Sequence, residues 1–175
     1  MIIGLCGPIG VGKSTLAKAL TSRAGEFHLK SSSLVLQVAP NNHQQTRAEL
    51  QASGDKLDAT THYRWLIDGA KSVYKADPTI TRVVIDSCRH MRQVEELRKE
   101  YKKEFVLIAL RCDVASLLER LQVRHPDKED LAATLKAFEH PLEQNLGGIA
   151  AMADIVFDTV RFSSKELASC CATLI

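Results

Sequence analysis

The feature that most constrains this chain is the glycine-rich segment Gly7–Ser14, whose sequence GPIGVGKS satisfies the pattern G-x-x-x-x-G-K-[ST]. An apolar run over Ile2–Cys6 precedes it and an amphipathic pattern over residues 14–23 follows it, which favours a phosphate-binding loop over a glycine turn with an incidental Lys-Ser pair. In such a loop, small residues let successive backbone N–H groups surround a phosphate at the start of a helix. Lys13 is expected to bridge the β- and γ-phosphates, and Ser14 to bind Mg²⁺ through its hydroxyl. The residues expected to bind the nucleotide are Gly7, Pro8, Ile9, Gly10, Val11, Gly12, Lys13, Ser14 and Thr15.

Apolar runs alternate with amphipathic patterns along the rest of the chain. Strands are expected at 2–6, 27–30, 82–86, 105–110 and 154–157. Helices are expected at 14–23, 33–38, 44–54, 60–75, 91–101, 114–124, 131–145 and 164–174, with Pro141 interrupting the seventh. Continuous apolar strands that alternate with helices indicate a parallel sheet covered on both faces. The predicted fold class is therefore α/β, with three layers and a five-stranded parallel sheet.

Composition gives no support to several classes of function. The formal net charge is +2 and aromatic residues make up 5% of the chain, so neither a basic field nor a base-stacking surface points to a nucleic-acid partner. No apolar run has membrane-spanning length and no leader sequence is visible, which together predict a cytoplasmic protein without a membrane partner. The five cysteines form no CxxC pair and are expected to be small buried thiols.

A second candidate for phosphate chemistry is Asp86, which ends the apolar strand expected at 82–86. Ligands of an open parallel sheet bind at the carboxyl ends of its strands, where both Asp86 and the phosphate loop are expected. An acid in this position can support magnesium, although an aspartate after a strand can equally serve as a helix cap. The phosphate loop favours the magnesium role.

Five arginines could surround a transferring phosphoryl group. Arg120 and Arg124 share one face of a helix that precedes a polar break, an arrangement that suits a mobile lid, although their spacing alone also fits a solvated face. Arg89 lies three residues after Asp86, at the same edge of the sheet. Arg47 and Arg64 lie in or beside the longest polar stretch, where either an acceptor-binding role or a surface role is possible.

Several segments together resemble the nucleoside-monophosphate-kinase-like branch of the P-loop kinases, and in particular deoxynucleoside-monophosphate-kinase-like and dephospho-CoA-kinase-like proteins. The segments that carry the resemblance are the loop Gly7–Ser14, residues 46–55, 84–89 with 93–97, 119–124, and 153–156 with 164–167. The resemblance covers nearly the whole chain and implies one P-loop kinase domain over 1–175. It also implies the strand order 2-3-1-4-5, an acceptor-side insertion at about 40–76 and a lid at about 120–131.

The resemblance further implies an ATP- and Mg²⁺-dependent transfer of the γ-phosphoryl group to a small nucleotide-like acceptor, by a monomer or a homodimer. The catalytic residues would be Lys13, Asp86, Arg120 and Arg124. The metal would be held by Ser14 and Asp86. The acceptor would be bound by Arg47, Arg64 and Arg89. The segment around Asp158 and Thr159 would lie near the adenine ring.

Three departures from this branch concern the acceptor and the lid. Relatives carry an acid soon after the second strand, whereas the corresponding run here, Ser31-Ser32-Ser33-Leu34, has none. Asp158 stands where relatives have asparagine, and Leu117 where they often have arginine. Three alternatives stay open on the sequence: a nucleoside monophosphate kinase, a dephospho-CoA kinase-like enzyme, and a regulatory nucleotide-binding protein that has lost its acceptor site.

Overall fold

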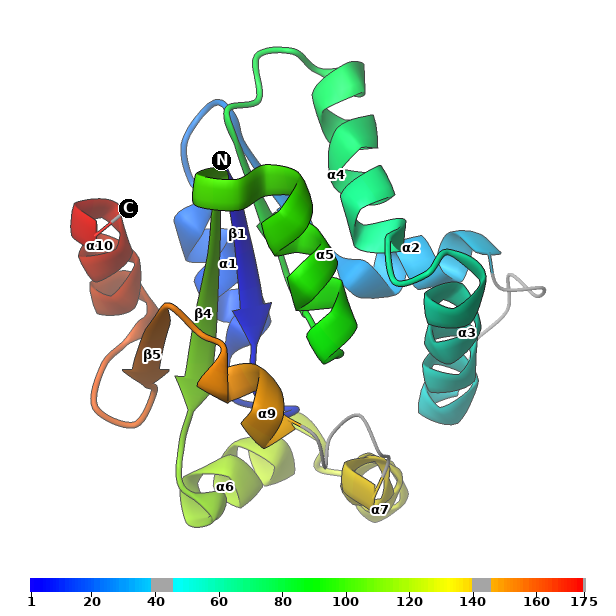
Figure 1. Ribbon diagram of the computed structural model, residues 1–175. Helices are drawn as coiled ribbons and strands as arrows, with labels where there is room; N and C mark the ends of the chain where they lie inside the picture. Colours follow the sequence, from blue (N-terminus) through cyan, green and yellow to red (C-terminus); the bar gives the residue numbers. More distant parts are fainter. Residues whose placement is uncertain (39–45, 140–145, 175) are drawn as a thin grey trace.

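The computed structural model, which describes residues 1–38, 46–139 and 146–174, is built on a five-stranded parallel sheet (Figure 1). The strands are β1 (Ile2–Cys6), β2 (Glu26–Leu29), β3 (Arg82–Ile85), β4 (Phe105–Arg111) and β5 (Ile155–Asp158). Their order is β2-β3-β1-β4-β5, which confirms the predicted order and the P-loop NTPase fold. The central strand β1 pairs with β3 and with β4, so Ile2 lies beside both Val83 and Phe105.

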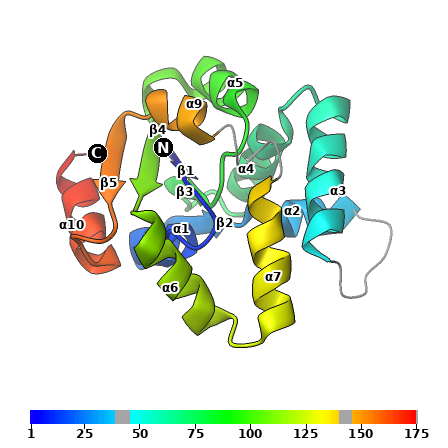
Figure 2. The same cartoon turned by 90° about the horizontal axis from the view of Figure 1, so that it is seen from below.

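Helices cover both faces of the sheet and complete the three layers (Figure 1). Two of them, α1 (Lys13–Leu20) and α10 (Ser164–Leu174), pack on one face. The other face carries α4 (Trp65–Ala76), α5 (Met91–Tyr101) and α9 (Leu146–Ala151). The remaining helices are α2 (Ser31–Val38), α3 (Arg47–Thr60), α6 (Val114–Arg124), α7 (Lys128–Lys136) and the 3₁₀ turns η1 (Lys102–Glu104) and η2 (Ala137–Glu139). Figure 1 shows α6 and α7 beyond the carboxyl ends of the strands, and Figure 2 shows the two helices diverging from the turn that joins them.

Every residue of β1 is buried, and its side chains alternate between two cores. Ile2 and Cys6 pack against α4, α5 and α9, whereas Ile3 and Leu5 pack against α1 and α10. The continuous apolar run in the sequence therefore reflects a strand covered on both faces, as predicted. This burial fixes where β1 ends, and hence where the phosphate loop begins.

The helices of the polar stretch differ from the prediction. A break between residues 55 and 59 was expected, but α3 continues to Thr60 and α4 begins at Trp65. Helix α3 starts at a capping box in which Thr46 and Glu49 satisfy each other's backbone amides, and it accommodates Gly54 in its interior. The chain instead turns at His62 and Tyr63, which both adopt positive φ angles (51° and 64°). This later turn places Asp58 inside a helix instead of in a loop.

A second difference concerns the helix expected over 131–145. Helix α7 begins earlier, at Lys128, because Asp127 accepts hydrogen bonds from the backbone amides of Glu129 and Asp130. It ends at Lys136, and Pro141 lies outside the described residues. Helix α9 lies in a segment for which no element was predicted.

The cysteines follow the prediction only in part. Cys6, Cys88 and Cys171 are buried, Cys112 is half-buried, and Cys170 is exposed on α10. Burial raises the pKa of the Cys6 thiol to about 11, so this residue acts as a small apolar side chain. None of the helices in the described parts of the chain is both long and apolar enough to cross a membrane.

Candidate functional site

The phosphate loop joins the end of β1 to the start of α1 and depends on three glycines with positive φ angles, Gly7, Gly10 and Gly12. A Cβ atom at Gly7 would lie 2.4 Å from the carbonyl oxygen of Leu110 on β4, and one at Gly10 would lie 2.9 Å from Leu121 Cδ2. At Gly12 a Cβ would meet nothing within 4 Å, so there only the φ of 105° favours glycine. The loop is thus packed against β4 and α6 at its first half and open at its second.

Lys13, the first residue of α1, folds back over the loop. Its Nζ donates hydrogen bonds to the carbonyl oxygens of Gly7 (2.7 Å) and Pro8 (2.9 Å), and the residue is 9% exposed. Ser14 and Thr15 are exposed in the first turn of the helix. The positive end of the helix dipole and an ammonium group therefore converge on this loop, which suits a phosphate.

Asp86 follows β3, and its backbone amide donates to the carbonyl oxygen of Leu29 at 3.0 Å. Its Oδ2 lies 3.0 Å from Nε2 of His28 on β2. The helix-cap alternative for Asp86 is wrong, because the cap of α5 is His90, which forms a capping box with Gln93. The carboxylate therefore does not cap α5, and its Oδ2 is held by His28 at the sheet edge.

The residues predicted to bind a magnesium ion are Ser14, through its hydroxyl, and Asp86, through its carboxylate. Both are hard oxygen ligands of the kind that Mg²⁺ takes. Within the described parts of the chain, no group of three or more His, Cys, Asp or Glu side chains could hold a metal. An ion bound by these two residues would complete its coordination with phosphate oxygens and water, as Mg²⁺ commonly does.

Arg120 connects the phosphate loop to the segment after β5. Its guanidinium donates to Thr159 through Oγ1 (2.8 Å) and the backbone oxygen (2.7 Å), and reaches the Val11 carbonyl at 3.4 Å. These residues line a cavity, named here the donor cavity, which also includes Thr15 and Phe162. Arg124 is the last residue of α6 and is exposed.

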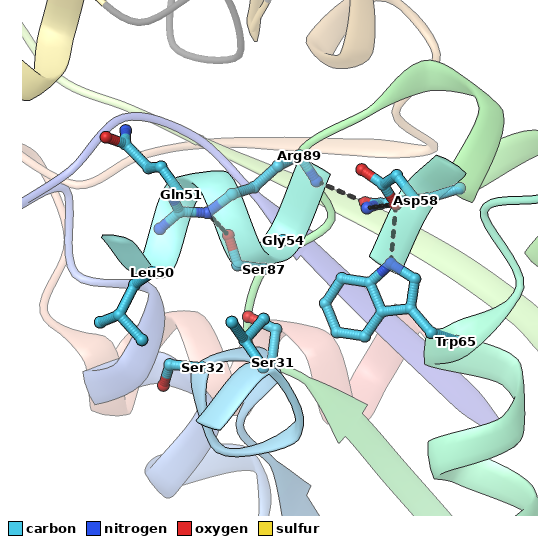
Figure 3. Close-up of a pocket in the computed structure, with 11 residues that line it drawn as sticks. Ser31, Ser32, Leu50, Gln51, Gly54, Asp58, Trp65, Ser87 and Arg89 are labelled. Atoms are coloured by element: carbon cyan, nitrogen blue, oxygen red, sulfur yellow. Dashed lines mark hydrogen bonds between the residues drawn. The ribbon is translucent and has the colours of Figure 1, made fainter. Parts of the chain in front are cut away.

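A second cavity, named here the α3 cavity, lies beyond the carboxyl ends of β2 and β3 (Figure 3). Helices α2, α3, α4 and α5 and the segment between β3 and α5 supply its walls. Its lining consists of Ser31, Ser32, Val35, Leu50, Gln51, Gly54, Asp58, Trp65, Ser87, Arg89 and Gln93. Of the predicted acceptor residues, only Arg89 belongs to this wall, and its Nε donates to Ser87 Oγ at 3.0 Å.

Arg64 and Arg47 occupy different places. The Arg64 guanidinium donates to Glu96 (3.0 Å) and Glu100 (2.7 Å) on α5, and Arg64 is not part of the cavity wall. These ion pairs give Arg64 a structural role in joining α4 to α5. Arg47 is the first residue of α3.

The sequence analysis missed Asp58, which is 5% exposed on the wall of the α3 cavity. Its Oδ1 accepts hydrogen bonds from Trp65 Nε1 and from Gln93 Nε2, both at 2.7 Å (Figure 3). Burial raises the pKa of this carboxyl above its ordinary value, and the bonds from Gln93 and Trp65 oppose that rise. The sequence signal that could have found it is the helical spacing of Gln51, Gly54 and Asp58, which share one face of α3.

Comparisons with known proteins agree with this architecture. The Bacillus subtilis YorR protein, solved in complex with phosphorylated GDP, is 21% identical, with a TM-score of 0.55 over 99% of this chain and 95% of that chain. Shikimate kinase from Acinetobacter baumannii, in complex with shikimate, is 20% identical, with a TM-score of 0.56 over 99% and 91%. Shikimate kinase from Bacteroides thetaiotaomicron is 14% identical, with a TM-score of 0.58 over 99% and 97%. At these identities the likeness shows the fold.

The sequence comparisons show the family. No curated protein matches the chain in sequence. A family profile described as an AAA domain matches residues 3–137, a range that contains the phosphate loop, both neighbouring strands of β1 and Asp86. On this match over most of its length, the chain belongs to the AAA domain family.

Proposed function

We propose that the protein is an ATP-dependent kinase that transfers the γ-phosphoryl group to a small nucleotide-like acceptor, a nucleoside or deoxynucleoside monophosphate. The observation that carries this proposal is that two cavities lie at the two strands that flank β1, the strand that leads into the phosphate loop. The donor cavity includes Leu110 of β4, and the α3 cavity includes Ser87 and Arg89, just beyond β3. Since β3 and β4 are the two neighbours of β1, a donor and an acceptor can approach the loop from opposite sides.

In this reaction the bond between the γ-phosphorus and the β,γ-bridging oxygen of ATP breaks. A phosphate oxygen of the acceptor forms the new bond, and ADP leaves with the electron pair. Negative charge is conserved, so the protein's task is to position and neutralise charge. Lys13 would neutralise the β- and γ-phosphates, Ser14 and Asp86 would hold Mg²⁺, and Arg89 would bind the acceptor phosphate.

We assign the lid role to residues 120–131, which run from the end of α6 through the break at 125–127 into α7. Arg124 lies exposed on this segment and would reach the transferring group when the segment closes. Arg120 already contacts the phosphate loop and Thr159, so it would act from the side of the ATP base. The acceptor-side insertion is assigned to residues 40–76, which contain α3.

Two observations support a kinase over a regulatory nucleotide-binding protein. The missing acid near Ser33 suggested a lost acceptor site, but Asp58 supplies a carboxylate to the α3 cavity from another helix. Several proteins with the same fold are small-molecule kinases, including the two shikimate kinases.

The test is an acceptor panel. Purified protein with Mg·ATP is offered nucleoside monophosphates, deoxynucleoside monophosphates, nucleosides, dephospho-CoA and shikimate, and ADP and phosphorylated product are both quantified. We expect stoichiometric ADP and product with monophosphates only. Phosphorylation of dephospho-CoA alone would show that the protein is a dephospho-CoA kinase-like enzyme instead. Slow ADP release that is independent of every acceptor would overturn the kinase proposal.

A further inference from the structure

The α3 cavity has two chemically different ends. Gln51 and Asp58 lie on the same face of α3 and are seven residues apart, which corresponds to about 10 Å along a helix. Figure 3 shows the Arg89 side chain directed toward Gln51 and away from Asp58. One end therefore carries a guanidinium group and an amide, and the other end carries a carboxyl group.

The end of the cavity at Gln51 offers hydrogen-bond donors to a ligand. The Nε2 atom of Gln51 is buried and has no hydrogen-bond partner among the described residues. A buried N–H without a partner is costly, and an oxygen of a bound ligand would satisfy it. Together with the positive charge of Arg89, this favours an anionic group such as a phosphate.

The end of the cavity at Asp58 offers a rigidly held hydrogen-bond acceptor. Both hydrogen bonds from Trp65 and Gln93 terminate on Oδ1, and the Asp58 backbone oxygen accepts a further bond from the Tyr63 amide at 2.9 Å. Among the described residues, no hydrogen bond reaches Oδ2. The left-handed turn at His62 and Tyr63 is what returns the chain so that Trp65 meets Asp58. The carboxyl is thus held in one orientation with one oxygen unused.

The wall between these ends is apolar, with Val35, Leu50 and the Trp65 ring. A ligand that fits has an anionic group, a flat apolar body and a hydrogen-bond donor at the far end. Small polyhydroxylated acids lack the flat body, whereas a nucleoside monophosphate has all three.

We propose that Asp58 selects acceptors whose base carries an amino group, so that the protein prefers AMP, GMP or CMP to UMP and dTMP. This inference rests on the proposed function. An exocyclic amine donates to Oδ2, whereas uracil and thymine present carbonyl oxygens on both sides of their single N–H, and these oxygens repel a carboxylate. Asp58 is a specificity-determining residue, and Trp65 and Gln93 position it.

The experiment compares the wild type with Asp58→Asn by isothermal titration calorimetry of the five monophosphates without ATP, followed by kcat/KM for each with Mg·ATP. Asparagine keeps Oδ1 for Trp65 and Gln93 but replaces Oδ2 with an N–H donor. We expect the wild type to favour amino bases about 10- to 100-fold, the strength of one hydrogen bond to a charged group, and Asp58→Asn to reverse that order. Asp55→Asn, an equal charge change at an exposed position of α3, is the matched control and keeps the wild-type order.

The outcomes separate the two proposals. A reversed binding order without any phosphoryl transfer supports the role of Asp58 and overturns the kinase function. The same base preference in the wild type and in a cooperatively melting Asp58→Asn variant overturns the role of Asp58, as does a wild type that prefers UMP or dTMP or binds no monophosphate. Should Asp58→Asn not fold, Trp65→Phe tests the same point, because it removes one of the two hydrogen-bond donors to Asp58 Oδ1 and keeps an aromatic ring in the wall. It is expected to weaken the base preference while ATP affinity is retained.

Discussion

The phosphate loop and the α3 cavity lie on the same edge of one sheet but are built in different ways. The loop is a run of consecutive residues that presents mainly backbone groups, and the Lys13 side chain is held by carbonyl oxygens of the same loop. The cavity draws residues from four helices and a connecting segment, and its polar groups are fixed by side-chain contacts such as Trp65–Asp58. A backbone site tolerates few changes and serves one ligand group. A side-chain site can change its specificity by single substitutions.

The comparison predicts that the largest loss of activity comes from the loop. Lys13→Ala should lower kcat about 100- to 1,000-fold, because it removes the ammonium group that neutralises the developing charge on the transferring phosphates. The protein should still melt cooperatively. The measurement is ADP formation at saturating ATP and acceptor, together with thermal unfolding. The control is Lys18→Ala, since Lys18 is exposed on the same helix. Equal activity of the two variants would show that Lys13 takes no part in phosphoryl transfer.

Glycine substitutions should have opposite effects on stability in the two regions. Gly7→Ala should lower the free energy of unfolding by about 3 kcal/mol, because the new Cβ meets the Leu110 backbone and the φ is positive. Gly54→Ala should raise it by about 0.5–1 kcal/mol, because Gly54 lies inside α3 and its Cβ would make an ordinary contact, 3.9 Å from Val35 Cγ2. Urea unfolding of both variants checks the signs. The same sign in both would mean that the regions do not differ as described.

Two arginine substitutions test which residues of the α3 cavity region bind the acceptor. Arg89→Ala should lower kcat/KM for the acceptor about 10- to 100-fold with unchanged ATP affinity, because a charged contact to the acceptor phosphate is lost. Arg64→Ala should leave the acceptor KM nearly unchanged, since Glu96 and Glu100 hold its guanidinium. Steady-state kinetics with varied acceptor distinguishes them. A larger effect at Arg64 than at Arg89 would show that the cavity wall has been assigned to the wrong residues.

The same contrast explains which parts the sequence could predict. The strands and the phosphate loop follow from local patterns, since a buried parallel strand is a continuous apolar run in the sequence and the loop is contiguous. The strand order is not a local property, and it was expected only from the family resemblance. The place of Asp58 in the cavity could not be predicted, because its partners, Trp65 and Gln93, reach it only through the turn at 62–63 and the packing of α3 near α5. The end of α3 was predicted too early because Gly54 suggests a helix end, whereas the Thr46–Glu49 capping box and tertiary packing extend the helix past it.

The smallest predicted effect is the pH dependence of stability at the α3 cavity. Burial raises the pKa of Asp58 in the folded state above its ordinary value of 3.8. Between these two pKa values the folded protein binds more protons than the unfolded chain, so the contribution of Asp58 to stability falls as pH rises through that window and is constant above it. Asp58→Asn lacks this decline. Its stability relative to the wild type should therefore increase with pH above 3.8, and urea unfolding of both proteins from about pH 4 to pH 7 measures it. A constant difference over that range would show that the Asp58 carboxyl titrates as it does in water. That result would contradict the burial of Asp58 in the α3 cavity, and only the phosphate loop would then be described correctly.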